Sequence, residues 1–319
     1  MSKTSSESST IPWFPRDWSS KSAWLESAHL AARVFRRDVA QATPQQIRQA
    51  IELASRLNPG PWGGEFHERR DDGWRGAEVT WKEHSEGTVI WIHGGAFAFG
   101  SPRVYRAAAV HLARATRCRV VLPQYRLAPN HTFPCAHDDV FQAVTSLVSK
   151  HGNVVLLGDS AGGNLAMGAM RRWMMENQSS GKIVGLALLS PWCDLRREAA
   201  SIEANLVAHS PFNHEDSMEY SQQYLAGHKA ADPAVSPLMI ETFRGWPDTY
   251  LEWSKDEFLA PDVALLQAKF DHDGVRLKSR IEEEAVHGWQ LLPDFLPEAR
   301  RSSLALGAWV RHVLELQPA

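Results

Sequence analysis

Residues 154 to 164 read VVLLGDSAGGN, and this stretch decides the fold. Four consecutive apolar residues predict a short buried strand, and a helical pattern begins directly after the stretch at Leu165. Between them lies the pattern G-x-S-x-G, with Ser160 between Gly158 and Gly162. A sharp turn from strand to helix lifts such a serine above the edge of a sheet, and glycines leave room for the turn. The context therefore predicts Ser160 as a nucleophile, against the alternative of a glycine-rich turn with an incidental serine.

A second predicted strand ends in a pair of glycines. Residues 88 to 92 read TVIWI, and residues 93 to 97 after them read HGGAF. Acyl transfer needs backbone N–H donors directed at the developing oxyanion, and consecutive glycines let a loop approach the bound carbonyl closely. We expect these donors to be Gly94 and Gly95, together with Ala161, which follows the nucleophile.

A serine nucleophile needs a base, and the base needs an orienting carboxylate, in the chain order Ser, Asp or Glu, His for this type of sheet. Of the 14 histidines, His287 is the one that follows a late predicted strand directly. Asp256 follows the preceding predicted strand, so the two residues fall on adjacent loops at one end of the sheet. We predict a triad of Ser160, Asp256 and His287, with Glu257 and Asp262 as the rival acids.

Short apolar runs alternate with helical patterns over most of the chain. The predicted strands cover residues 77–82, 88–92, 118–123, 153–157, 183–189, 249–253 and 278–284. The predicted helices cover residues 105–116, 137–150, 163–176, 260–273 and 298–316. Near-continuous apolar strands between helices indicate a mostly parallel sheet that is covered on both faces. The fold class is therefore α/β, in a doubly wound arrangement.

The N-terminal part has a different pattern. Apolar residues at helical spacing between residues 17 and 57 predict two amphipathic helices, with Thr43 as an N-cap and Pro44 in the first turn of the second. We expect these helices to cover the site. The predicted organisation is a flexible leader over residues 1–12, cap helices over 13–60 and a catalytic α/β domain over 61–319, in which about 196–245 form an insertion that contributes to the cap.

The composition limits the partners. Lys and Arg number 34 against 37 Asp and Glu, a net charge of −3, which is too balanced for a nucleic-acid-binding surface. No apolar run approaches the about 20 residues needed to span a membrane, and the first ten residues lack an apolar signal core. The three cysteines (Cys118, Cys135 and Cys193) favour reduced thiols in a cytoplasmic protein. No metal cluster or dinucleotide fingerprint is present, so we expect no cofactor; a homodimer stays open.

With these motifs placed, residues 77 to 316 resemble the hormone-sensitive-lipase-like carboxylesterases of the α/β-hydrolase fold. Further matching stretches are YRLAP at 125–129, FP at 133–134, DD at 138–139, SPWCDL at 190–195, DP at 232–233, SPL at 236–238 and HGW at 287–289. The resemblance implies a serine hydrolase that cleaves carboxylic esters through an acyl-enzyme. It assigns Ser160 as nucleophile, Asp256 as acid, His287 as base, and Gly94, Gly95 and Ala161 as the oxyanion hole.

Three positions depart from the family pattern. Ala96 stands where a third glycine is usual, Glu-Phe follows Asp256 where Pro-Leu is usual, and Trp289 stands where phenylalanine is usual. Aromatic residues near the ends of the motifs are expected to contact the substrate: Phe97, Trp192 and Trp289.

Other functions use the same residues. An acyltransferase, a lactonase or an amidase similar to arylformamidase would keep the triad and change the acceptor or the bond. A small-molecule receptor on a hydrolase scaffold, as in the plant gibberellin receptors, is a third class. Those receptors resemble this family but have lost the base, whereas His287 is present here.

Overall fold

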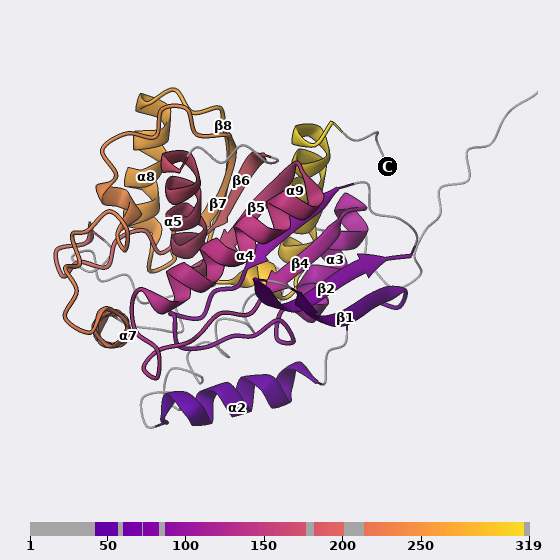
Figure 1. Ribbon diagram of the computed structural model, residues 1–319, viewed down its shortest axis with the longest axis horizontal. Helices are drawn as coiled ribbons and strands as arrows, with labels where there is room; N and C mark the ends of the chain where they lie inside the picture. The colour runs from indigo at the N-terminus through magenta and orange to yellow at the C-terminus, as the bar shows by residue number, and fades with distance from the viewer. Residues whose placement is uncertain are drawn as a thin grey trace, which may run out of the picture.

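The computed structural model describes residues 42–56, 60–71, 73–82, 87–176, 182–200 and 214–315. These residues form an eight-stranded sheet in the order β1-β2-β4-β3-β5-β6-β7-β8, flanked by helices (Figure 1). The strands are β1 (Gly64–Asp71), β2 (Trp74–Trp81), β3 (Thr88–Ile92), β4 (Arg119–Pro123), β5 (Val154–Asp159), β6 (Ile183–Leu189), β7 (Asp248–Ser254) and β8 (Leu277–Glu282). The pairs β1–β2 and β2–β4 are antiparallel, and all pairs from β4 through β8 are parallel. The predicted, mostly parallel α/β sheet is confirmed.

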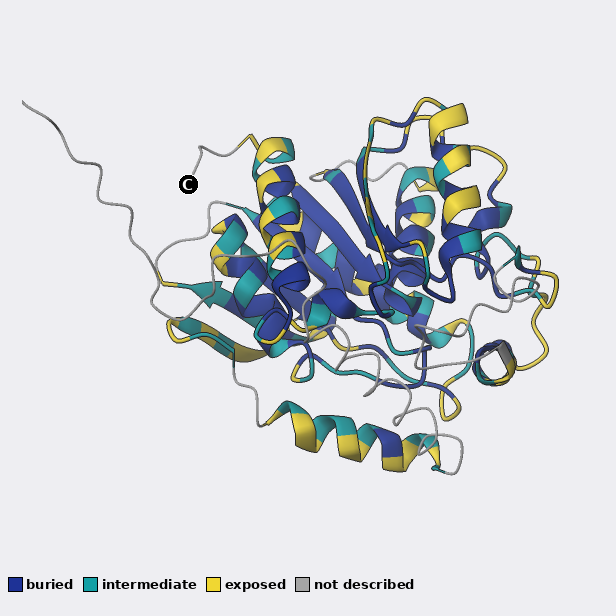
Figure 2. Cartoon of the chain, turned by 180° about the vertical axis from the view of Figure 1, so that it is seen from behind, coloured by how far each residue is buried: buried dark blue, intermediate teal, exposed yellow. Residues whose placement is uncertain are grey.

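The helices lie on both faces of the sheet. They are α3 (Arg106–Thr116), α4 (Cys135–His151), α5 (Ala161–Met175), α8 (Ala260–His272) and α9 (Pro297–Val313), with two short 3-10 helices, η1 (Pro237–Met239) and η2 (Trp289–Leu291). Side chains of α4, α5 and α8 join one buried apolar cluster, and those of α3 and α9 join another. In β5, Val154 and Leu156 belong to the first cluster, whereas Val155 and Leu157 belong to the second. The central strands are therefore buried on both faces, as Figure 2 shows.

The second predicted N-terminal helix is confirmed as α2 (Pro44–Ser55). Thr43 forms a capping box with Gln46, and Pro44 occupies the first turn, where its missing N–H costs nothing. Ile47 is buried, while much of the opposite side of α2 is exposed (Figure 2). The first predicted helix falls mostly on residues 1–41, outside the described residues.

Within the predicted insertion, the structure describes helix α7 (His214–Leu225) and the 3-10 helix η1. Residues 201–213 of that insertion also lie outside the described residues. Within the described stretches, no helix has the length and apolar character that a membrane span requires. None of the three cysteines forms a disulfide, and Cys118 and Cys193 are buried.

Candidate active site

Ser160 occupies a strained turn between β5 and α5. Its backbone has φ 51° and ψ −125°, a conformation that typically costs about 1–3 kcal/mol and persists only where the surroundings enforce it. A Cβ atom at Gly158 would lie 2.3 Å from the carbonyl oxygen of Gly162, and one at Gly162 would lie 2.1 Å from that of Ile92. The two glycines of the motif are therefore steric requirements of this turn, as predicted from the sequence.

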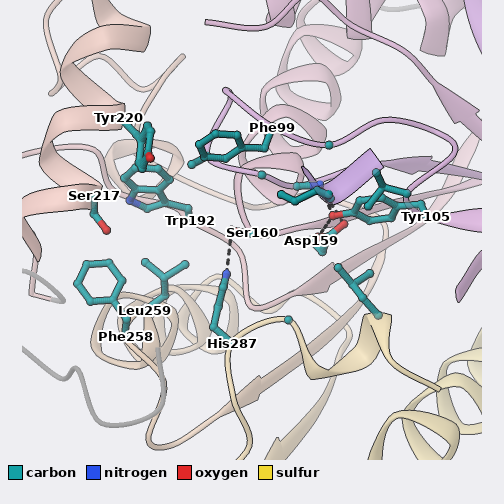
Figure 3. Close-up of a pocket in the computed structure, with 18 of the residues that line it drawn as sticks. Phe99, Tyr105, Asp159, Ser160, Trp192, Ser217, Tyr220, Phe258, Leu259 and His287 are labelled. Carbon is teal, nitrogen blue, oxygen red and sulfur yellow. Dashed lines mark hydrogen bonds between the residues drawn. The ribbon is translucent and has the colours of Figure 1, made fainter. Parts of the chain in front are cut away.

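His287 lies next to the serine, as Figure 3 shows, and contacts a carboxylate with its other nitrogen. Its Nε2 is 2.9 Å from Ser160 Oγ, and its Nδ1 is 2.8 Å from Glu257 Oε2. The consistent tautomer donates its Nδ1 proton to Glu257 and accepts the serine hydroxyl proton at Nε2. The fold thus joins a serine, an imidazole and a carboxylate in one chain of hydrogen bonds.

The carboxylate in this chain is Glu257, so the prediction of Asp256 is wrong. The turn after β7 directs the Glu257 side chain back to the sheet, where it is fully buried and its Oε1 accepts the Ser254 N–H at 3.1 Å. Asp256 points to the neighbouring loop instead, and its Oδ2 accepts the Glu284 N–H at 3.0 Å. Asp262, the other rival, is buried in the first turn of α8.

The loop after β3, residues 93–100, contains the HGGAF stretch in which oxyanion donors are expected, and we call it the oxyanion loop. Its Gly94 N–H donates to the Tyr105 hydroxyl at 2.8 Å and to Asp159 Oδ1 at 3.2 Å. The prediction of Gly94 as an oxyanion donor is therefore wrong, because its N–H already donates to these two buried acceptors. Among the hydrogen bonds of the described chain, none uses the N–H of Gly95 or Ala161.

Asp159 holds this loop through hydrogen bonds of its buried carboxylate. Its carboxylate accepts hydrogen bonds from the Tyr105 hydroxyl at 2.6 Å and from Trp91 Nε1 at 2.9 Å, besides the Gly94 N–H. Burial raises the pKa of Asp159 to about 6, although these hydrogen bonds oppose the rise. Burial also lowers the pKa of His93 to about 4, so its ring is neutral near pH 7.

A cavity of about 400 Å³ opens at Ser160 and His287. Figure 3 shows Trp192, Tyr220, Phe258 and Leu259 on one side of the reacting pair, with Tyr105 on the other. The walls come from α2, the oxyanion loop, the segment before α3, the segment after β6, α7, the segment after β7 and the segment after His287. Their apolar and aromatic side chains are Ile51, Phe99, Val104, Tyr105, Trp192, Tyr220, Phe258, Leu259, Leu291 and Leu292. No group of three metal-ligating side chains occurs within the described residues.

Residues 89–291 match the α/β hydrolase fold family. The chain belongs to this family. An esterase of Acinetobacter venetianus is 29% identical over 263 residues, which cover 81% of this chain and 86% of that protein. An acetyl-hydrolase of Streptomyces hygroscopicus is 29% identical over 227 residues, or 70% and 75% of the two chains. The crystal structure of an esterase from the bacterial hormone-sensitive lipase family superposes with a TM-score of 0.84 at 25% identity, covering 92% of this chain and 99% of that one. The predicted resemblance is confirmed.

Phe97, Trp192 and Trp289 were expected to contact the substrate. Of these three residues, only Trp192 lines the cavity. Phe97 is fully buried and stacks on Tyr224, with ring centroids 4.0 Å apart. Trp289 is also fully buried, in a small apolar cluster beyond His287. The predictions of Phe97 and Trp289 are therefore wrong, because both side chains turn into the interior.

Protonation of Asp159 is expected to make the stability of this hydrolase depend on pH. The pKa of about 6 in the folded chain exceeds the ordinary 3.8, so between these values the folded chain holds a proton that the unfolded chain has lost. The stability from this group is greatest below pH 4, falls as pH rises to 6, and is constant above that. Relative to Asp159→Asn, the wild type should gain about 1 kcal/mol in free energy of unfolding when pH falls from 7.5 to 5.

Urea denaturation of both proteins at the two pH values measures this gain. The comparison cancels the titration of groups that the two proteins share. A stability difference that stays the same at pH 5 and pH 7.5 would contradict a titrating, buried Asp159.

Proposed function

We propose that this hydrolase cleaves carboxylic esters of small to medium size, with Ser160, His287 and Glu257 as its catalytic triad. The observation that carries the proposal is the hydrogen-bonded chain from Ser160 through His287 to the buried Glu257. Ester hydrolysis by this route needs only water as a second substrate.

The triad residues take separate parts in the reaction. Ser160 Oγ attacks the ester carbonyl while His287 Nε2 takes its proton, and the imidazolium then donates that proton to the leaving alcohol. Glu257 keeps the imidazole in the required tautomer and stabilises its positive charge. In the second half, His287 takes a proton from water as the water oxygen attacks the acyl-enzyme. The imidazolium then returns this proton to Ser160 Oγ as the bond between Oγ and the acyl carbon breaks, which releases the carboxylic acid and restores the serine.

Backbone donors near Ser160 stabilise the oxyanion in this mechanism. We assign this role to the N–H groups of Gly95 and Ala161, and add that of Ala96, which was not among the donors expected from the sequence but lines the cavity beside Gly95. The N-terminus of α5 begins at Ala161, and its dipole favours negative charge at the same place.

The cavity supports an uncharged, apolar substrate. Its described walls are largely aliphatic and aromatic, and among these described residues the ionisable side chains are His287, the buried Asp159 and two tyrosines. Relatives named as an esterase and an acetyl-hydrolase fit the same chemistry. A receptor without catalysis has no use for an aligned base, so the bonded His287 favours an enzyme.

A panel of p-nitrophenyl esters with acyl chains from two to twelve carbons tests this function. We expect hydrolysis by the wild type, with kcat/KM about tenfold or more higher for the short and medium chains than for the longest, because the cavity volume limits the acyl group. Product analysis with an added alcohol or amine separates hydrolysis from acyl transfer. Absence of turnover across the panel would contradict the proposal.

We also propose a cytoplasmic location, because none of the three cysteines forms a disulfide and oxidising compartments favour disulfides. Cell fractionation tests the location. The homodimer stays a prediction that analytical ultracentrifugation tests.

A further inference from the structure

Arg48 of α2 connects this helix to two loops beside the active site. Its Nε donates to the carbonyl oxygen of Ala98, in the oxyanion loop, at 2.6 Å, and its Nη2 donates to the carbonyl oxygen of Ala128. Ala128 lies in the loop after β4, and its own N–H donates to the Phe97 carbonyl at 2.9 Å. One guanidinium therefore holds both loops at the point where they meet.

The oxyanion loop has an unfavourable backbone that needs such support. Gly95, Ala96 and Phe97 follow one another with φ of 112°, 50° and 59°. Residues other than glycine rarely adopt this left-handed backbone region. Such a strained backbone persists where contacts with neighbouring residues hold it in place. The N–H groups of Ala98 and Phe99 both donate to the Gly95 carbonyl, at 2.9 and 2.7 Å, which closes the turn. Arg48 binds the carbonyl of Ala98, three residues further along the loop.

The contacts that Arg48 makes with described residues are directed at backbone carbonyl oxygens rather than at a counter-ion. Among the ion pairs of the described residues, none includes Arg48, and burial alone shifts its pKa. Burial lowers the pKa of Arg48, as expected for a cation that is partly removed from water. An arginine can hold two carbonyl oxygens in fixed directions, because its donors form a rigid planar fork.

The same face of α2 carries two more contacts to this region. Ile51 lines the cavity, and Glu52 accepts a hydrogen bond from the Ser101 hydroxyl at 2.7 Å and pairs with Arg103 at 3.3 Å. Positions 48, 51 and 52 are neighbours on a helix surface. The docked face of α2 thus touches the cavity and the backbone that supplies the oxyanion donors.

We propose that Arg48 is a positioning residue that holds the oxyanion loop in its catalytic conformation and couples the docking of α2 to transition-state stabilisation. This inference rests on the proposed ester hydrolysis. A helix that only covered the cavity would affect substrate binding. Arg48 instead fixes the loop whose Gly95 and Ala96 donors act on charge that develops in the transition state.

Arg48→Met tests the proposal, with Arg56→Met as the matched control, because Arg56 ends the same helix with an exposed side chain. We expect Arg48→Met to lower kcat about 10- to 100-fold, with KM changed less than about threefold, because misplaced donors weaken only the transition state. The inhibition constant of butylboronic acid, which forms a tetrahedral adduct on the serine, should rise by a similar factor. Arg56→Met should match the wild type in all three values.

Two further variants, Arg48→Lys and Arg48→Ala, keep the proposal testable if Arg48→Met does not fold. Arg48→Lys keeps the charge and one direction of donation, so its kcat should fall between those of the wild type and Arg48→Met. Added ethylguanidine should raise the kcat of Arg48→Ala and leave that of Arg56→Met unchanged. Equal kcat in Arg48→Met and Arg56→Met, a loss confined to KM, or a lack of both rescues would overturn the proposal. Inactive wild-type protein would instead refute the ester hydrolysis on which it rests.

Discussion

Ser160→Ala is expected to lower kcat for a p-nitrophenyl ester by about 10⁵-fold, because removal of a triad nucleophile leaves only the oxyanion donors and binding to act on the substrate. The fold should survive the change. The hydroxyl contributes one hydrogen bond, to His287, and alanine retains the Cβ that the turn already accommodates. Steady-state kinetics on the purified variant measures the loss, and circular dichroism checks the fold.

The control for this variant is Ser303→Ala. Ser303 lies on α9, and its hydroxyl donates to the Ala299 carbonyl within the same helix, at 3.0 Å. Its kcat should stay within about twofold of the wild type, as is usual for a substitution away from the site. Retention of more than about a tenth of the wild-type activity by folded Ser160→Ala would refute the serine mechanism.

Much of the fold could be predicted because the decisive signals are local. Strands β3 and β6 match their predicted bounds, since runs of apolar residues buried on both faces need no partner to be recognised. Strand β1 was missed because its sequence, GEFHERRD, is mostly exposed at the sheet edge and shows little apolar alternation. Only its antiparallel pairing with β2 makes it a strand.

The site shows the same division between local and long-range determinants. Ser160 and His287 could be predicted because each follows a recognisable strand in a short motif. The role of Gly94 depends on Tyr105 and on buried Asp159, 65 residues away, which both accept a hydrogen bond from the Gly94 N–H. Cavity residues such as Ile51 and Tyr220 come from helices whose docking no motif encodes.

The choice between adjacent carboxylates after β7 could not be made from sequence, because it depends on the path of one turn. Side chains of successive residues there point in different directions, so a shift of one residue exchanges a buried carboxylate for one bonded to the neighbouring loop. The family pattern favoured Asp256, whereas the contact to His287 is made by the longer side chain of Glu257. The turn returns Glu257 to the Ser254 N–H, and this second contact fixes its carboxylate.

Glu257→Gln is therefore expected to lower kcat by about 10³- to 10⁴-fold, whereas Asp256→Asn should stay within about threefold of the wild type. A glutamine that faces Nδ1 with its NH₂ group imposes the wrong imidazole tautomer, and an amide cannot stabilise the imidazolium charge. Asn at position 256 keeps an oxygen that can accept the Glu284 N–H, so the neighbouring loop keeps its contact.

Both variants conserve shape, so kcat for the same ester measures the charge and proton requirement of each position. Glu257→Asp adds a geometric control, because it keeps the charge and shortens the reach to His287, and its activity should exceed that of Glu257→Gln. If Asp256→Asn were the damaging change and Glu257→Gln nearly silent, the imidazole in the working enzyme would have to turn away from the buried carboxylate that it contacts at 2.8 Å. That result would identify Asp256 as the catalytic carboxylate and would require a different conformation of the turn after β7.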